Sequence, residues 1–175
     1  MSSLKELTAV KHKEAESQPF IKSIFAGEVD KAKYVNYLYQ LLYVYKKLEQ
    51  YGDNIGLFSG MEGIKRYHAI EEDYVELMGD PPYPAVRKST EEYVSYLKDI
   101  AEDGNKLMAH IYVRHMGDLF GGQMLAKLLP GPNNMFRFEN MPELIKVFRT
   151  KLDISMADEA NVAFQYNINI LKEYD

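Results

Sequence analysis

The chain has 175 residues, enough for one domain with a buried core and too few to expect two. It contains no cysteine, which excludes disulfides, thiolate ligands and cysteine nucleophiles, and its net charge of −5 argues against nucleic-acid binding. No apolar run approaches the ~20 residues of a membrane span or resembles a secretory leader. We therefore expect one domain over 1–175, soluble and cytoplasmic, with no membrane anchor and no nucleic-acid partner.

Apolar residues recur at helical spacing from the N-terminus onward. Ser3 and Glu6 have the spacing of a capping box at the start of a first helix, and Asp30 can cap a second, longer one. Glycine and proline within 79–84 form the clearest break in the chain. In this half we expect helical segments at 3–16, 17–25, 30–51 and 61–78.

The second half has the same periodicity, and Pro142 is typical of a first helical turn. No strand alternation or internal repeat competes with the helical pattern. The sequence therefore predicts an all-α fold of seven to nine helices. The expected segments of this half are 89–102, 105–129 and 142–174, the last with a restart near residue 155.

Three glycines within six residues interrupt the predicted helix 105–129. Each costs about 1 kcal/mol relative to alanine inside a helix. A helix that keeps them bends, crosses another helix closely, or lies against a flat ligand. Arg114 and Asp118 are four residues apart and share one helix face, a spacing that an ordinary surface ion pair would also explain. The glycines are Gly117, Gly121 and Gly122.

The first predicted helix carries a candidate metal ligand. His12 lies with Lys5 and Glu16 on one stripe beside the core-facing stripe. Neutral imidazole is a common ligand of heme iron, but a single histidine on a helix is more often a surface or satisfied core residue. From the helix alone, both interpretations stay open. The histidines that we do not expect to be ligands are His68, His110 and His115.

Residues 117–123, Gly-Asp-Leu-Phe-Gly-Gly-Gln, resemble the distal-helix signature Gly-Asp-Leu-Ser-Gly-Gly-Gln of heme oxygenases. Residues 12–16 are similar to the family's proximal His-x-x-Ala-Glu motif, and 159–167 to its Glu-Ala-Asn-x-Ala-Phe-x-x-Asn segment. Residues 39–49 are similar to its third-helix segment, so the resemblance covers nearly the whole chain. It implies an all-α, single-domain helical bundle with heme between a proximal N-terminal helix and a glycine-kinked distal helix.

The resemblance also implies a set of heme contacts. His12 would be the axial ligand of the iron, with Glu16 orienting its imidazole. The distal glycines would let the backbone lie against the heme face, and basic and phenolic side chains would bind the propionates. The residues to which the resemblance assigns heme binding are His12, Lys5, Glu16, Tyr112, Gly117, Gly121, Gly122, Arg149 and Phe164.

The implied activity uses heme b as both cofactor and substrate. With O2 and electrons from an external reductant, the ring would open to biliverdin, the IXα isomer, with release of carbon monoxide and ferrous iron. Ferredoxin or a flavin reductase would be the electron donor, docking on basic residues that ordinary solvation explains equally well. Distal water that delivers protons would be held by a catalytic set consisting of Asp118, Arg114, Tyr45 and Asn167.

Two positions depart from the family pattern where heme orientation is set. Phe120 replaces the usual serine, and Ile145 stands where a lysine often precedes the propionate-binding arginine. These departures bear on which meso carbon is attacked. Two other classes of function stay open: a noncatalytic heme carrier or sensor on the same fold, and a carboxylate-bridged di-iron bundle. The latter requires paired Glu-x-x-His motifs, which the sequence lacks.

Overall fold

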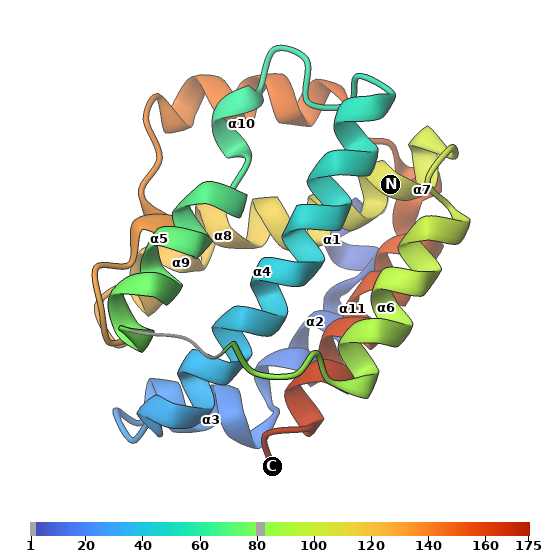
Figure 1. The fold of residues 1–175 in the computed structure, drawn as a ribbon. Coiled ribbons are helices and arrows are strands. Elements are labelled where there is room, and N and C mark those ends of the chain that lie inside the picture. The colour runs from blue at the N-terminus through green and yellow to red at the C-terminus, as the bar shows by residue number, and fades with distance from the viewer. Residues whose placement is uncertain (1–2, 80–82) are drawn as a thin grey trace.

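The structure is a computed structural model that describes residues 3–79 and 83–175. Helices are the only regular secondary structure in these residues, so the predicted all-α fold is confirmed (Figure 1). The α-helices are α1 (Leu4–Leu7), α2 (Ala9–Glu16), α3 (Pro19–Phe25), α4 (Lys31–Asn54), α5 (Tyr67–Met78), α6 (Lys88–Asp99), α7 (Gly104–Ile111), α8 (Gly117–Phe120), α9 (Gly122–Leu125), α10 (Met141–Thr150) and α11 (Ala157–Lys172). The remaining helical turns are η1 (Glu62–Ile64), the π-helical η2 (Tyr112–Met116), η3 (Asn134–Phe136) and η4 (Ile154–Met156).

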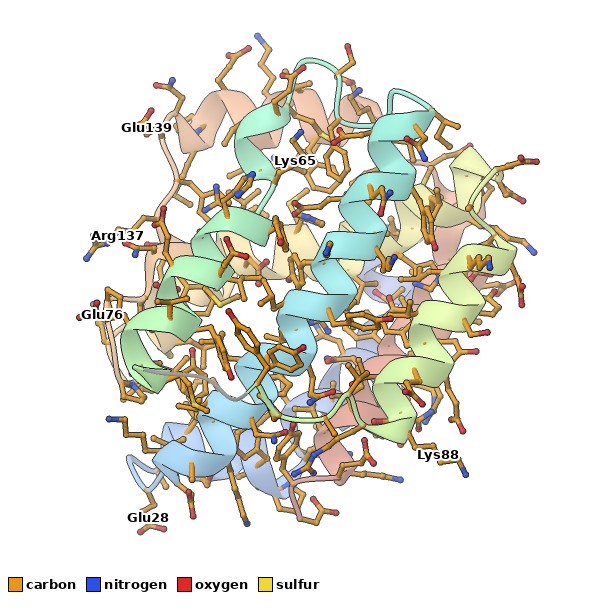
Figure 2. The ribbon with its side chains drawn as sticks, viewed as in Figure 1. Glu28, Lys65, Glu76, Lys88, Arg137 and Glu139 are labelled. Atoms are coloured by element: carbon orange, nitrogen blue, oxygen red, sulfur yellow. The ribbon has the colours of Figure 1, made fainter. Side chains whose placement is uncertain are left out.

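Helix α4 runs through the middle of the molecule and packs against α5, α6 and α7 (Figure 1). It begins where expected, because the Asp30 carboxylate accepts the Lys33 N–H at 3.1 Å and satisfies one free amide of the first turn. Leu38 and Leu48 are fully buried on its core face, where each contributes about 1.5–3 kcal/mol. Charged side chains project outward around this core (Figure 2), as Glu28, Glu76, Lys88, Arg137 and Glu139 illustrate.

The first helix is interrupted where the sequence predicts continuity. The Thr8 hydroxyl donates to the Leu4 carbonyl at 3.0 Å, and the backbone leaves helical geometry at this residue. Threonine competes for backbone partners in this way. Two helices, α1 and α2, therefore replace the single predicted one.

The predicted helix 61–78 starts late, at Tyr67. Buried Arg66 explains the delay, because its guanidinium donates to the carbonyl oxygens of Gly63 and Arg137, each at 2.7 Å. In a continuous α-helix, the Gly63 carbonyl oxygen would instead accept the backbone N–H four residues later. Residues 62–64 form only a 3-10 turn.

The predicted helix 105–129 is divided into α7, η2, α8 and α9. The π-helical turn lies directly before the glycines, and such turns often occur at functional sites. These interruptions raise the number of α-helices among the described residues above the predicted seven to nine. Helix α11 packs on α2, α7 and η2, so it holds the first helices beside this interrupted region. None of the helices within 3–79 and 83–175 has the length and apolarity needed to cross a membrane.

Candidate functional site

The four residues expected to hold distal water come together in the structure. The Tyr45 hydroxyl donates to Asp118 Oδ2 at 2.6 Å, and Arg114 Nη1 donates to Asn167 Oδ1 at 2.6 Å. The Arg114 guanidinium lies 5.4 Å from the centre of the Tyr45 ring, so the two hydrogen-bonded pairs are in contact with each other. Four different elements, α4, η2, α8 and α11, supply these side chains. Their spacing in the sequence predicted proximity only for Arg114 and Asp118.

Burial sets the electrostatics of this cluster. It raises the pKa of Asp118 to about 6, although the Tyr45 hydrogen bond and the charges of His115 and Arg114 act in the opposite direction. Burial, followed by the Asp118 charge, also raises the pKa of Tyr45 well above its usual value, so Tyr45 is a neutral donor. A carboxyl group with a pKa near 6 can both take up and release protons close to neutral pH.

Asp118→Asn is expected to stabilise the chain at alkaline pH. Because folding raises the Asp118 pKa, its contribution to stability is fully present below about pH 4 and is lost as pH rises through about 6. The asparagine variant should therefore have a free energy of unfolding about 1–2 kcal/mol higher at pH 8, a gain that shrinks toward zero near pH 4. Urea denaturation at both pH values measures this, with the exposed Asp158→Asn as control. A gain that does not depend on pH would contradict it.

His12 lies on α2 with 52% of its side chain exposed. Its Nε2 is 2.8 Å from Glu16 Oε1, and its ring stacks on Phe164 at a centroid distance of 5.3 Å. Glu16 therefore engages one ring nitrogen and Phe164 engages one ring face, while most of the imidazole edge stays accessible. Across residues 3–79 and 83–175, no three His, Asp or Glu side chains cluster as a metal site. A metal bound at His12 would thus need most of its ligands from another molecule.

Helix α11 connects the two groups of candidates. Phe164, which stacks on His12, and Asn167, which binds Arg114, are one helical turn apart. Tyr112 in η2 provides a second link, because burial raises its pKa while the nearby Thr8 side chain, at the junction of α1 and α2, lowers it in part. The first helices and the π-helical turn are thus held near each other.

Apolar side chains are exposed on both of these regions. Val10 is 83% exposed and Leu7 43%, while Phe120 and Met124 beyond the π-helical turn are 54% and 62% exposed. A β-carbon added to Gly117 would meet no atom within 4 Å. Exposed apolar groups of this kind are typical of a surface that a ligand covers.

Polar atoms in the same region also fit the ligand that the resemblance implies. Arg114 Nε is buried and has no hydrogen-bond partner among the described residues, so it is free to hold water or ligand. An imidazole on α2 and a carboxyl group on α8 are the groups that a heme iron and its proton donor would use. The residues present therefore fit heme.

Gly122 has a packing reason that the sequence did not reveal. A β-carbon there would lie 2.2 Å from the buried Phe136 ring, whereas one on Gly117 meets open space. Gly122→Ala is expected to lower the free energy of unfolding by about 1–3 kcal/mol through overpacking. Gly117→Ala should change it by less than about 1 kcal/mol. Denaturant titration of the two variants measures the difference, and equal effects would contradict the assignment.

The candidates for propionate binding are less closely associated. Lys5 and Arg149 are both exposed, on α1 and α10, and the Arg149 guanidinium lies 5.9 Å from the centre of the Phe120 ring. Ile145 is partly buried against the core. Of the two positions that depart from the family pattern, Phe120 therefore lies beside the candidate arginine and Ile145 lies against the core.

A buried contact between a histidine and a carboxylate lies behind this site and was not predicted from the sequence. His115 Nε2 lies 2.8 Å from Glu49 Oε2, and both side chains are almost completely buried. The available signal was that Glu49 follows Tyr45 by four residues, which places both side chains on one face of α4. His68, in contrast, is exposed as expected.

Comparison with known proteins assigns the family. A sequence model described as Heme oxygenase matches residues 1–173. Heme oxygenase 2 of Macaca fascicularis is 30% identical over 203 residues, which cover 98% of this chain but only 64% of that protein. The chain therefore spans slightly less than two thirds of the length of this relative.

Two solved structures have the same fold. Heme oxygenase from Leptospira interrogans is 29% identical and superposes with a TM-score of 0.86 over 97% of both chains. Heme oxygenase-2 from Synechocystis sp., solved in complex with heme and NO, is 26% identical, with a TM-score of 0.86 over 98% of this chain and 83% of that chain. Together with the match over residues 1–173, these similarities show that the chain belongs to the heme oxygenase family.

Proposed function

We propose that this chain binds heme b and opens it, with O2 and electrons from an external reductant, to biliverdin IXα, carbon monoxide and ferrous iron. The observation that carries the proposal is the Asp118 carboxyl group, bound by Tyr45 at 2.6 Å with a pKa of about 6, on a glycine-rich segment with open space at Gly117. Bound heme would supply the redox chemistry toward O2, whereas the chain supplies position and protons.

On the proximal side, His12 would be the axial ligand. The Glu16 carboxylate at 2.8 Å holds one ring nitrogen, and stacking on Phe164 at 5.3 Å restricts rotation of the ring. Such a carboxylate fixes the tautomer and increases the donor strength of the other nitrogen.

On the distal side, Asp118 would transfer protons through water to the bound substrate. Tyr45 orients one carboxylate oxygen, and the bond from Arg114 to Asn167 fixes the guanidinium so that its buried Nε can hold that water. These groups would act through water and not as ligands of iron. They determine where a proton arrives, which separates ring opening from unproductive O–O cleavage.

Lys5, Tyr112 and Arg149 would bind the propionates and thereby fix the rotation of heme in its plane. Phe120 lies against Arg149 and would share this role. Gly117→Ala tests the distal face, since its β-carbon occupies space that is open in the chain alone. We expect this variant to keep its stability and to bind heme less tightly, measured by hemin titration.

The decisive experiment adds hemin, looks for a histidine-ligated Soret band, and then supplies reductant under O2. Formation of biliverdin with carbon monoxide supports the proposal, and chromatography of the product identifies the isomer. Tight heme binding without turnover would favour a heme carrier or sensor instead. For the electron donor we propose a ferredoxin or a flavin reductase. A comparison of turnover with each donor at low and high salt distinguishes them.

A further inference from the structure

A second polar contact lies beside the hydrogen bond between Tyr45 and Asp118. His115, in η2, has 0% exposure, and its Nε2 is 2.8 Å from Glu49 Oε2 on α4. The His115 ring also packs against the Tyr45 ring at a centroid distance of 5.1 Å and against Phe58 at 5.5 Å. Since Tyr45 contacts both His115 and Asp118, the imidazole lies one side chain away from the catalytic carboxyl group.

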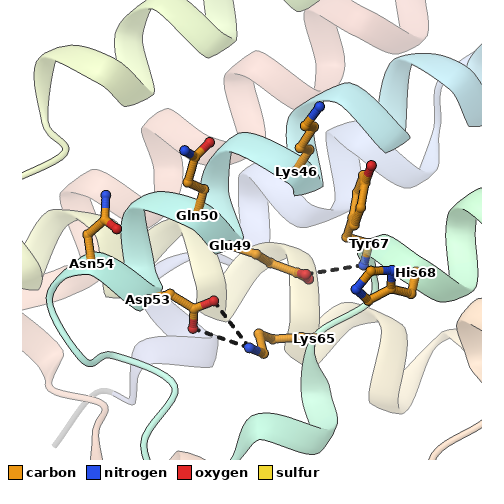
Figure 3. A pocket seen from close by; sticks show the side chains of 8 residues that line it. All are labelled: Lys46, Glu49, Gln50, Asp53, Asn54, Lys65, Tyr67 and His68. Carbon is orange, nitrogen blue, oxygen red and sulfur yellow. Dashed lines mark hydrogen bonds and ion pairs between the residues drawn. The ribbon is translucent and has the colours of Figure 1, made fainter.

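Glu49 is fixed independently of His115. Its Oε2 accepts the Arg66 N–H at 2.5 Å, and its Oε1 accepts the Tyr67 N–H at 3.1 Å at the start of α5 (Figure 3). It lines a cavity of about 350 Å³ whose rim carries the ion pair between Lys65 and Asp53 (Figure 3). A carboxylate held by two backbone amides keeps its orientation, so it can fix the tautomer of an imidazole as acidic partners of histidine commonly do.

The other ring nitrogen of His115 is the unusual feature. Nδ1 is buried and has no hydrogen-bond partner among residues 3–79 and 83–175. Buried polar atoms in proteins are nearly always satisfied, often by ordered water. The titratable and charged groups around this imidazole are Glu49 and Tyr45 from α4, Asp118 from α8, Arg114 from η2 and Arg66 before α5.

We propose that His115 is a proton-relay residue for Asp118, held in position by Glu49. In each transfer, the proton on Nδ1 of the imidazolium passes through one water to the Asp118 carboxylate. The imidazolium becomes neutral imidazole, and Asp118 becomes the carboxylic acid. Nε2 keeps its proton, which stays hydrogen-bonded to Glu49. A proton from the solvent then passes through water to Nδ1 and restores the imidazolium. This inference rests on the proposed function, because it names a source of the protons that heme opening consumes.

The chain offers a matched control in a second buried histidine. His110 also has 0% exposure, and its Nε2 is also 2.8 Å from a carboxylate, that of Glu159. Its Nδ1, however, is occupied by the Tyr93 hydroxyl at 2.7 Å. Replacing either histidine removes a comparable buried contact, but only His115 has a free nitrogen beside Asp118.

The test compares His115→Phe, His115→Gln and His110→Phe, each confirmed as folded by circular dichroism and by hemin affinity. We expect His115→Phe to slow biliverdin formation about tenfold at pH 8 and less at pH 6, where solvent protons are more abundant. His115→Gln can still hydrogen bond to Glu49 but cannot carry a proton, so it should show the same pH profile. For His110→Phe, any decrease should be the same at every pH. Wild-type behaviour of His115→Gln, or identical profiles for the two phenylalanine variants, would overturn the relay.

A second measurement does not depend on turnover. In ¹⁵N-histidine-labelled, heme-free protein, we expect the Nε2 signal of His115 to stay that of a nitrogen bound to Glu49, while the Nδ1 signal responds to pH between 5.5 and 8.5. A constant Nδ1 signal over this range overturns the relay. If the wild-type chain opened no heme at all, the proposed function would fail instead, whatever the Nδ1 signal showed.

Discussion

Asp118→Ala is expected to bind heme and to lose ring opening, with the rate of biliverdin formation lowered about 10²- to 10³-fold. The expected size follows from general acid catalysis, to which one positioned group usually contributes 10²- to 10⁴-fold. Asp118 makes its hydrogen bond to Tyr45 and not to any proximal candidate, so its removal leaves His12, Glu16 and Phe164 in place. Hemin titration and single-turnover absorbance measurements separate binding from ring opening.

Asp118→Asn is the matched variant, because it keeps the shape and an oxygen for the Tyr45 hydroxyl but cannot transfer the proton. Both variants should lose activity, and only the asparagine should gain stability at pH 8. Tyr45→Phe should reduce the rate less, since it removes the orienting bond and leaves the carboxyl group. A normal yield of biliverdin from Asp118→Ala would refute the assignment of Asp118.

Local sequence signals predicted the start of α4 and the break after α5 well. Asp30 caps α4 as expected, and Gly79 ends α5 with a φ of 80°. Cap residues and glycines act within one turn of the chain, so their effect can be read from neighbouring residues. The delayed start of α5 could not be predicted, because it depends on contacts of Arg66 with Arg137, 71 residues away.

In the candidate site, too, local features could be predicted and long-range contacts could not. The distal glycines are visible as a motif, but their different roles are not. Gly122 is explained by Phe136 packing over it, and Gly117 by open space, although the two are five residues apart in one signature. Pairing of Arg114 with Asn167, 53 positions later, likewise requires that α11 return to η2, which only tertiary structure determines.

The partner of His115 could not be predicted from residue spacing, because it lies 66 residues away. Counted along an ideal α-helix, His110 and His115 fall on different faces and predict no shared environment. The structure agrees, because His115, in the π-helical turn 112–116, contacts Glu49 on α4, whereas His110 contacts Glu159 on α11. Propensity scales carry no signal for a π-helical turn, so the contact between His115 and Glu49 became evident only in the three-dimensional structure.

His12→Ala is expected to remove the axial imidazole and to weaken heme binding by more than about tenfold. Loss of a residue that only orients a ligand typically costs 10- to 100-fold in metal affinity, and loss of the ligand itself should cost at least as much. The chain should stay folded, because the His12 side chain is 52% exposed and contacts chiefly Glu16 and Phe164. Absorbance spectra of the hemin complex would report the lost ligation, and hemin titration would report the affinity.

Added imidazole should restore the histidine-ligated spectrum of His12→Ala, because the alanine leaves space at a position that solvent reaches. His68→Ala is the matched control, since His68 is exposed near the start of α5 and lines the cavity beside Glu49. Glu16→Gln should keep the ligand and change the spectrum less than His12→Ala does. A spectrum unchanged in His12→Ala but altered in His68→Ala would move the axial ligand to α5. That outcome would refute the assignment of His12 as the axial ligand, whereas the assignment of Asp118 is tested separately by Asp118→Ala.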